Sequence, residues 1–460
     1  MGHQGPWDPL EGRRHRAERL LEGKTGETLS SPTVSTRLQR LAAQARQHPA
    51  MRFTTLAHLI DVDLLREAYH QTRRDGAPGV DGVTAAAYAA DREANLADLH
   101  ARLRSGRYYA PPVKRAYVPK EDGSQRPIGM PAFEDKVGQR AVAMLLGAIY
   151  EQDFHECSYG FREGRSPHQA LHVLRERCMQ EHIGWIVDAD VSAFFDSLDH
   201  DLWCEVLRQR VNDGAILRLI RKWLRAGVLE GETLSYPERG SPQGGVVSPL
   251  LANTFLDPVL DEWFEREVRP RMKGRCFLIR FADDCVIGCE REDDARRILG
   301  VLPKRFARFQ LTIHPQKTRL VRFQPPRHED EGGRGDGTFD FLGLTHYWAK
   351  SRRGYWVIKR RTAKKRLRRA LRAVWQWCRT HRHDPLREQY RQLRAKLRGH
   401  YQYYGIRGNY RKLEAFYRGV ERAWRYWLSR RGGPRTIRWE TFATLRVVLA
   451  LPLPRIVHHI

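Results

Sequence analysis

Two groups of carboxylates in this sequence have the residue types and the setting for metal chemistry. The first is Asp190 in the stretch DADVSAFFD, and the second is the adjacent pair Asp283 and Asp284 in RFADDCVIG. The apolar residues around the pair predict two strands that flank an acidic turn, a hairpin over 276–288. Adjacent carboxylates in such a turn repel each other and favour a cation, and a third carboxylate from a neighbouring strand would complete an oxygen-rich site for Mg²⁺.

A second acid competes with Asp190 for the place of the third ligand. The segment 185–195 is short and rich in β-branched and aromatic residues, which predicts a strand that runs into a turn. Side chains two residues apart on a strand point to the same face, so periodicity alone leaves both Asp188 and Asp190 open. The nearby Asp196 is expected to be a turn or capping residue.

The rest of the chain predicts the elements that must position these acids. Apolar spacing predicts helices from Phe53 to about residue 71, over 83–105, from about Phe133 to Tyr150, over 200–227 and over 292–310, and a hairpin over 113–130. Residues 240–245 form a glycine-rich loop before an apolar helix, where the backbone can approach a ligand closely. Strands and helices without regular alternation favour an α+β body followed by an all-α end.

Charge is distributed very unevenly along the chain. The 460 residues carry a formal net charge of +27. Residues 351–460 contain 30 Lys and Arg and five acids, whereas the first 350 residues contain 51 bases and 49 acids. A near-neutral body with one cationic end is typical of a catalytic unit joined to a module that binds a polyanion.

Composition excludes several classes of protein. A hydrophobic fraction of 41% and an aromatic fraction of 10% are ample for a packed core, which excludes wholesale disorder. No run of about 18 apolar residues could span a bilayer, and the first residues lack the apolar segment of a secretory signal. The seven cysteines are scattered, as expected of reduced thiols in a cytoplasmic protein. Residues 1–52 are predicted to form a basic, flexible leader that contains a helical stretch.

Seven motifs in a fixed order give the chain a specific resemblance. They are YVPKEDGSQRPIGMP (117–131), SYGFREGRSPHQAL (158–171), DADVSAFFDSLDH (188–200), GSPQGGVVSPLLAN (240–253), RFADD (280–284), LTIHPQKT (311–318) and FDFLGL (339–344). Together they resemble the reverse transcriptases of bacterial group II introns. The resemblance continues upstream into that family's N-terminal extension and downstream into its thumb, or maturase, domain, and covers roughly residues 53–460.

The resemblance implies a right-hand polymerase fold of the α+β class, with fingers, an antiparallel palm sheet and an all-α thumb. The implied divisions are a leader (1–52), an N-terminal extension with fingers (53–184), a palm with the catalytic carboxylates (185–350), a helical RNA-binding thumb or maturase domain (351–431) and a short tail (432–460). No Cys/His cluster follows residue 400, so the HNH endonuclease domain of some relatives is expected to be absent.

The resemblance also assigns roles in catalysis. It implies that Asp190, Asp283 and Asp284 are the catalytic metal ligands and that the carbonyl of Val191 adds an oxygen. The implied cofactor is Mg²⁺, as two ions for which Mn²⁺ can substitute. Two ions about 3.5–4 Å apart would activate a primer 3′-hydroxyl and stabilise the leaving pyrophosphate.

The aromatic Phe195 bears on both the ligand set and the choice of sugar. The family places its catalytic Asp five residues before an aromatic, which selects Asp190 over Asp188. A bulky ring beneath the ribose would clash with a 2′-hydroxyl and favour deoxynucleotides. RNA polymerases of similar layout use an Asp at this offset, whereas Asp196 stands one place later here.

Further residues are implied to contact nucleotide, primer or template. The residues implied to bind the nucleotide or its phosphates, besides Phe195, are Lys120, Arg126, Gln243 and Lys317. Those implied to contact primer, template or other RNA are Arg162, Gly244, Leu342 and Gly343. Plain structural alternatives stay open for this group, such as a charged hairpin around residues 120–126 and a surface lysine at 317.

The basic end predicts a helix with two kinds of surface. In the stretch RTAKKRLRRALRAVWQW, apolar residues recur at helical spacing and predict a packed stripe, namely Leu367, Leu371, Val374 and Trp375. The bases beside the stripe are expected to contact RNA phosphates, among them Lys364, Lys365, Arg368 and Arg369.

The implied function is an RNA-directed DNA polymerase that also binds intron RNA and promotes its splicing and retrohoming. Its partners would be structured RNA, an RNA template with a DNA primer, and deoxynucleoside triphosphates, in the bacterial cytoplasm and without a membrane. Two alternatives stay open: a domesticated relative that acts in defence or DNA repair, and a protein that serves mainly as an RNA-binding splicing cofactor. The sequence does not decide the oligomeric state.

Overall fold

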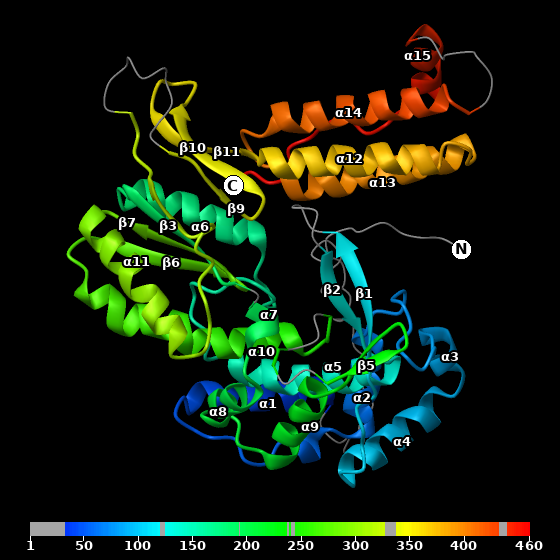
Figure 1. Cartoon of the computed structure of the whole chain (residues 1–460), viewed down its shortest axis with the longest axis vertical. Helices are drawn as coiled ribbons and strands as arrows, with labels where there is room; N and C mark the ends of the chain where they lie inside the picture. Colours follow the sequence, from blue (N-terminus) through cyan, green and yellow to red (C-terminus); the bar gives the residue numbers. More distant parts are fainter. Residues whose placement is uncertain are drawn as a thin grey trace, which may run out of the picture.

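The computed structural model describes residues 33–119, 125–192, 194–236, 239–240, 244–326, 337–431 and 439–460. Figure 1 shows these residues as three bodies: a four-stranded sheet with its helices, a helical body that carries a projecting hairpin, and a layer of long helices. We call them the palm, the fingers body and the thumb, the names that the resemblance suggests. The mixed architecture agrees with the predicted α+β class. Within the described residues, no helix is long and apolar enough to cross a bilayer.

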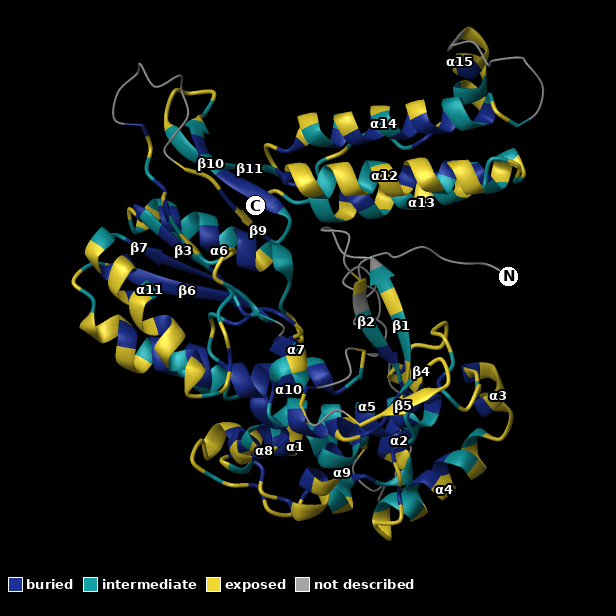
Figure 2. Ribbon diagram, viewed as in Figure 1, coloured by how far each residue is buried: buried dark blue, intermediate teal, exposed yellow. Residues whose placement is uncertain are grey.

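The palm is an antiparallel four-stranded sheet in the order β6-β7-β3-β8. Its strands are β3 (Trp185–Asp190), β6 (Cys276–Phe281), β7 (Asp284–Cys289) and β8 (Arg319–Arg322). Alternate side chains of the central strands enter two separate cores, one shared with α11 (Glu292–Ala307) and the other with α6 (Pro167–Gln180). Burial on both faces explains why β6 has no exposed residue (Figure 2).

The two strand predictions around the acids are confirmed in outline. The predicted hairpin over 276–288 is β6 and β7, and Asp284 already belongs to β7. The predicted strand over 185–195 ends at Asp190 and is followed by the short helix α7 (Phe194–Ser197).

The fingers body holds a second sheet, in the order β2-β1-β4-β5. The predicted hairpin over 113–130 is confirmed as β1 (Val113–Pro119) and β2 (Gln125–Met130). The other two strands are β4 (Val228–Glu230), which pairs with β1 in parallel, and β5 (Thr233–Ser235). This parallel pair was not predicted, because its strands are distant in sequence and neither specifies the other locally.

Helices surround the central helix α5 (Phe133–Tyr150), whose predicted bounds are confirmed. Those that pack on α5 are α1 (Val34–Gln47), α2 (Val62–Gln71), α3 (Ala85–Ala90) and α10 (Ser248–Leu256). The same part of the chain also contains α4 (Arg92–Arg104), α8 (His200–Arg208) and α9 (Gly214–Leu224), the short 3₁₀ helices η1 (Ala57–Leu59) and η4 (Arg269–Arg271), and the π-helices η2 (Asp257–Asp261) and η3 (Phe264–Val268). Most of their apolar faces meet in one large core.

The leader differs in part from the expected flexible segment. Residues 1–32 lie outside the described residues, but 33–52 contain α1, which packs against α5. Ala45 on this helix is fully buried, and its carbonyl accepts a hydrogen bond from Arg210 at 2.9 Å. Residues 33–52 are therefore part of the fingers body.

The thumb begins later than expected. A small sheet of β9 (Phe339–Phe341), β10 (Leu344–Lys350) and β11 (Trp356–Thr362) joins it to the palm. The thumb helices are α12 (Lys364–Thr380), α13 (Leu386–Tyr404), α14 (Tyr410–Leu428) and α15 (Trp439–Val448). Because β11 pairs with β10 across position 351, the helical body starts at residue 364, and the expected tail over 432–460 contains α15.

The predicted stripe on α12 is confirmed except at one position. Val374 is buried, and Leu367 and Leu371 pack against the thumb core. Trp375 is 39% exposed and lies against Tyr426, with the ring centroids 4.6 Å apart. One residue turns a helix by about 100°, so a side chain next to Val374 points away from the core.

Candidate active site

The catalytic carboxylates predicted from the sequence meet at one end of the palm sheet. Asp190 ends β3 and is the register partner of Asp284, which begins β7. Asp283 lies beside them in the turn between β6 and β7. Val191 is buried, and its backbone bridges to Ile313, so the strand end is fixed by a neighbouring segment.

The electrostatics of this cluster favour a cation. Burial, together with repulsion from Asp283, Asp188 and Asp190, raises the pKa of the Asp284 carboxyl to about 7. The Arg366 guanidinium opposes this rise. A carboxyl whose pKa is raised by three neighbouring carboxylates marks a site that gains stability from a positive ion.

Two basic side chains already lie against the acids of β3. The Lys317 ammonium is 2.9 Å from a carboxylate oxygen of Asp190, and the Arg319 guanidinium is 3.1 Å from one of Asp188. Lys317 keeps 62% of its side chain exposed. Lys317 is therefore more than an ordinary surface lysine, because it contacts a predicted metal ligand although most of its side chain is exposed.

The residues fit a divalent metal in chemistry but are not arranged as a finished site. Carboxylate oxygens are the ligands that Mg²⁺ prefers, and the Lys317 ammonium stands in for a cation at Asp190. Within the described residues, no group of three or more His, Cys, Asp or Glu side chains converges closely enough to hold an ion. Asp190, Asp283 and Asp284 are the residues that would hold an ion here.

Arg366 is a functional candidate that the sequence did not single out. It lies in the first turn of α12, and its positive charge lowers the pKa of Asp284 in the palm. In the sequence it is one base among many in the stretch KKRLRR. Only the fold, which returns the start of the thumb to the palm, distinguishes it from its neighbours.

Phe195 lies where the glycine-rich loop meets the palm. Its ring is half-buried and packs edge-to-face on Phe194, with centroids 5.2 Å apart. Gly240 has a φ of +85°, and a Cβ at this position would lie 2.8 Å from the carbonyl oxygen of Phe195. The glycine thus permits the loop to touch the backbone of α7.

The other end of the same loop contacts the fingers. Gly244 has a φ of +121°, and a Cβ there would lie 2.3 Å from the carbonyl oxygen of Gly129 in β2. The loop from residue 240 to 244 therefore joins the palm to the fingers hairpin. Gln243 and Lys120 lie outside the described residues, and the Arg126 backbone belongs to β2.

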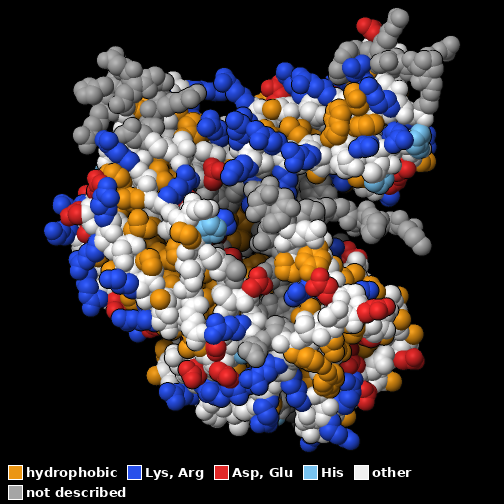
Figure 3. Space-filling model, viewed as in Figure 1, with side chains coloured by type: hydrophobic (Ala, Val, Ile, Leu, Met, Phe, Trp, Pro, Cys, Tyr) orange, Lys and Arg blue, Asp and Glu red, His pale blue; other side chains and the backbone are white. Residues whose placement is uncertain are grey.

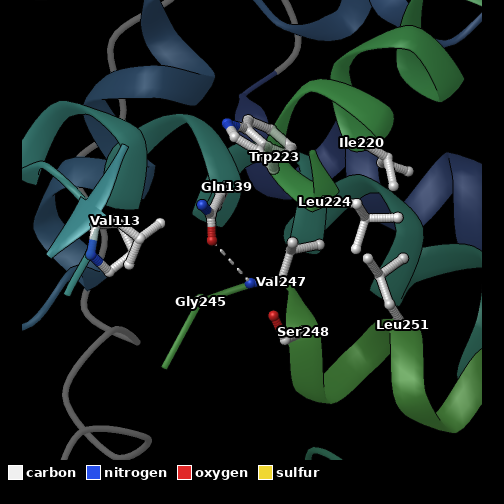
Figure 4. Close-up of a pocket in the computed structure, with 10 residues that line it drawn as sticks. Val113, Gln139, Ile220, Trp223, Leu224, Gly245, Val247, Ser248 and Leu251 are labelled. Carbon is white, nitrogen blue, oxygen red and sulfur yellow. Dashed lines mark hydrogen bonds between the residues drawn. The ribbon is translucent and has the colours of Figure 1, made fainter. Parts of the chain in front are cut away.

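A buried glutamine holds the start of the following segment. The Gln139 side-chain carbonyl accepts a hydrogen bond from the Val246 amide at 2.8 Å. Beside it is a small cavity of about 20 Å³ lined by Gly245, Trp223 and Leu251 among others, drawn in Figure 4. This volume accommodates about one water molecule, so the cavity belongs to the support of the loop and cannot hold a nucleotide.

Arg162 is committed to partners within the protein. Its guanidinium donates to Glu151 at 3.0 Å and to the carbonyls of His155 and Ser158 at 2.7 and 3.0 Å. The side chain is only 5% exposed. The Nε and Nη1 donors thus hold the loop before α6, and a contact of Arg162 with the template stays a prediction.

The predicted primer hairpin lies at the junction of palm and thumb. Leu342 and Gly343 form the two-residue turn between β9 and β10 with φ values of 49° and 74°, as a type I′ turn requires. The Tyr403 hydroxyl donates to the carbonyl of Leu342 at 3.0 Å. The turn is thereby fixed to α13, and its contact with a primer stays a prediction.

The bases predicted to bind RNA lie on the surface of the thumb. Four of them are exposed on the first turns of α12, namely Lys364, Lys365, Arg368 and Arg369. Figure 3 shows Lys and Arg side chains gathered along the thumb helices on the side that faces the fingers. A nucleic acid held between these bodies would meet this basic surface.

Comparison with known proteins agrees with this architecture. Residues 118–346 match the family model described as reverse transcriptase (RNA-dependent DNA polymerase). Protein YkfC of Escherichia coli (strain K12) is 37% identical over 231 residues, which are 49% of this chain and 61% of that protein. Group II intron-encoded protein LtrA of Lactococcus lactis subsp. cremoris is 33% identical over 227 residues, 49% of this chain and 37% of LtrA.

A plant relative extends the comparison. Nuclear intron maturase 2, mitochondrial, of Arabidopsis thaliana is 30% identical over 30% of this chain and 24% of its own length. Residues 118–346 are therefore similar to the reverse transcriptase family, and the relatives matched here include a group II intron-encoded protein. The chain spans less than two thirds of the length of YkfC and LtrA.

Proposed function

We propose that this protein is an RNA-directed DNA polymerase that extends a primer 3′-end with deoxynucleoside triphosphates on an RNA template. The observation that carries the proposal is the pairing of Asp190 with Asp284 beside Asp283, in a domain that matches the reverse transcriptase family. These three carboxylates, with the carbonyl of Val191, are the proposed metal ligands. Bound Mg²⁺, or Mn²⁺ in its place, would lower the pKa of the primer hydroxyl and neutralise charge on the departing pyrophosphate.

The chain's own residues supply positioning and charge. Lys317 is proposed to leave Asp190 when metal binds and to serve the pyrophosphate as an electrostatic partner or proton donor. Phe195 is proposed to lie beneath the sugar and exclude a 2′-hydroxyl. Lys120, Arg126 and Gln243 are proposed to contact the incoming nucleotide.

The reaction can be tested directly with purified protein. A DNA primer on an RNA template, with all four deoxynucleoside triphosphates and Mg²⁺, is expected to be extended to the end of the template. Parallel reactions with ribonucleoside triphosphates or with EDTA should give no extension. Failure to extend with deoxynucleotides, under conditions in which the protein is folded and binds the primer–template, would contradict the proposal.

A second proposed function is the binding of structured intron RNA to promote splicing and retrohoming. It is favoured by the exposed bases of α12 and by the basic composition of the thumb, with 30 Lys and Arg against five acids after residue 350. The test is splicing of an intron precursor RNA by an Asp283→Ala variant. Splicing that persists without DNA synthesis would establish two independent activities, whereas absence of splicing by the wild-type protein would favour a role in defence or DNA repair.

A further inference from the structure

A charged side chain without any exposed surface contacts the turn between β6 and β7. This turn consists of Ala282 and Asp283 and is called the catalytic turn below. Arg280 in β6 is 0% exposed, and its Nε donates to both carboxylate oxygens of Asp261, at 2.8 and 3.0 Å. Its Nη1 donates to Asn253 Oδ1 at 2.8 Å and its Nη2 to Ser158 Oγ at 2.8 Å. These three partners are also 0% exposed. A buried charge is costly unless every donor is satisfied, as it is here.

The same guanidinium holds the backbone of the turn. Arg280 Nη1 also donates to the carbonyl oxygen of Ala282 at 3.1 Å, immediately before Asp283. Ala282 has a φ of 58°, a left-handed conformation that is unfavourable for a residue with a Cβ. The surroundings must therefore hold Ala282 in place, and this hydrogen bond is one of the contacts that do so.

A second contact reaches the turn through the loop before α6. Asn253 Nδ2 donates to the carbonyl of Gly160 at 2.7 Å, which continues the network. A Cβ on Gly160 would lie 2.3 Å from the backbone nitrogen of Ala282, so only glycine permits this approach. The Tyr159 amide in turn donates to the carbonyl of Arg280 at 2.9 Å. The turn is thus clamped between Arg280 and Gly160.

The effect of this network on the catalytic acids must be geometric. The charge of Arg280 is matched by the carboxylate of Asp261 in a bidentate pair, so little of it remains to attract other groups. An ion pair that served only the stability of the core would not have to include a hydrogen bond to the backbone of Ala282, as this one does. The connection runs from Asp261 and Asn253 through Arg280 to the residue before Asp283.

We propose that Arg280, Asp261 and Asn253 form a positioning network that fixes the turn so that Asp283 and Asp284 can share a divalent metal. The inference rests on the proposed polymerase function and adds residues that do not touch substrate. Loss of the network should weaken metal binding by about 10- to 100-fold, the range found when the partners that orient metal ligands are removed.

Two kinds of variant test the network. Asn253→Ala removes one link without leaving a charge unpaired. The double variant Arg280→Met/Asp261→Leu replaces the buried pair by apolar side chains of similar size, a change that buried ion pairs often tolerate. Asn253→Ala loses the bonds to Arg280 and Gly160, the two residues that hold the turn, and the double variant loses the bond to Ala282 itself. The double variant is expected to stay folded, whereas a single change at Arg280 would leave the charge of Asp261 buried and unpaired.

The chain offers a matched control in a second buried arginine. Arg210 is 7% exposed, pairs with Asp153 at 2.7 Å and donates to the carbonyl of His48 at 2.9 Å. It joins α1 to the rest of the fingers body, and its partners among the described residues lie away from the catalytic turn. Arg210→Lys should lower the unfolding temperature and leave metal binding within about twofold of the wild type.

The measurement is Mn²⁺ binding by electron paramagnetic resonance, on complexes with a chain-terminated primer–template and the complementary deoxynucleotide. Mn²⁺ bound at the proposed site is identified as the part of the signal that disappears in the Asp283→Ala variant. The proposal expects the Kd for this Mn²⁺, and the Mg²⁺ concentration at half-maximal extension, to rise by about 10- to 100-fold in both network variants. The Kd for primer–template should stay within about twofold.

The possible results distinguish a failure of the positioning network from a failure of the proposed polymerase function. Network variants that bind Mn²⁺ as tightly as the wild type, or that change only as much as Arg210→Lys, overturn the positioning role. A wild-type protein that neither extends a primer nor shows Mn²⁺ sensitive to Asp283→Ala overturns the proposed polymerase itself.

Discussion

At the scale of single residues, the properties of the site depend on how neighbouring groups hold each side chain in position. Phe195 is half-buried and is supported on one side by the ring of Phe194. Because its place is fixed by packing, its size should decide which sugar is accepted. A truncated side chain should therefore change selectivity more than rate.

Phe195→Ala is expected to reduce the preference for deoxy- over ribonucleotides by about 10- to 100-fold, as the removal of a steric clash worth about 1.4–3 kcal/mol would. The measurement is the ratio of kcat/KM for dCTP and CTP in single-nucleotide extension. Phe306→Leu is the control, since it truncates a buried ring on α11 and should lower stability without changing the ratio. An unchanged ratio in Phe195→Ala would contradict this role for the ring.

The acids proposed to be catalytic could be picked out from the sequence, but the residues that surround and support them could not. Two acids in an apolar hairpin turn are rare enough to be noticed in a sequence. Arg366 and Asp261 give no such signal, because their relation to Asp284 and Arg280 depends on elements far away in the chain. Arg162 is a different case: its motif was clear, but the sequence did not predict that its Nε and Nη1 donors bond Glu151 and two backbone carbonyls.

At the scale of elements, glycines decide how closely the loop at 240–244 approaches its neighbours. Gly244→Ala would strain a φ of +121° and bring a Cβ to 2.3 Å from the carbonyl of Gly129. We expect it to reduce primer extension at least about tenfold, because the palm and the fingers could not keep their contact. Gly82→Ala is the control, since Gly82 has a φ of +68° but nothing within 4 Å of the added Cβ. Equal effects of both changes would show that strain alone matters.

The buried start of α5 should make the stability of the fingers depend on pH. Burial raises the pKa of Asp135 to about 7, although the Tyr108 hydroxyl donates to it and lowers it. Since the folded state holds this proton more tightly than the unfolded state, the contribution is present below about pH 4 and is lost as the pH rises through 7.

Asp135→Asn keeps a neutral side chain at all pH values and should remove this dependence. We expect the wild-type free energy of unfolding to fall between pH 5 and 8 by on the order of 2–4 kcal/mol more than that of the variant. Urea unfolding at a series of pH values measures the difference. Parallel pH profiles for the two proteins would contradict the raised pKa.

Most elements near the site were predictable because their signals are local. The hairpins at 113–130 and 276–288 and the helix over 133–150 follow from alternation and helical spacing within each segment. The parallel pairing of β1 with β4 and the position of β11 are tertiary features that the segments themselves do not specify.

At the scale of the whole molecule, the uneven charge predicts that different parts of the chain catalyse the reaction and bind RNA. The near-neutral first 350 residues would carry the active site, and the basic thumb would bind RNA. Four exposed bases on α12, Lys364, Lys365, Arg368 and Arg369, should contribute to RNA affinity through phosphate contacts. Changing all four to Gln should weaken binding to a structured RNA and reduce the slope of log Kd against log salt by about 3–4 if each base contacts one phosphate. Filter binding at several salt concentrations gives both quantities.

A matched change elsewhere controls for net charge. Four exposed bases lie on α11 of the palm or directly before it, namely Arg291, Arg296, Arg297 and Lys304. Their replacement by Gln removes charge of the same sign away from the thumb and should leave the salt slope nearly unchanged. Equal losses in both variants would mean that total charge, and not the thumb surface, sets RNA affinity.

The most direct test of the whole account is single-nucleotide extension of a DNA primer on an RNA template by Asp283→Ala. Asp196→Ala is the control, because Asp196 is a nearby exposed acid outside the proposed ligand set. We predict that Asp283→Ala reduces the rate at least about 1,000-fold while primer–template binding and the unfolding temperature stay close to those of the wild type, and that Asp196→Ala remains active. Extension by Asp283→Ala at the wild-type rate would contradict the assignment of the carboxylate cluster as the polymerase site.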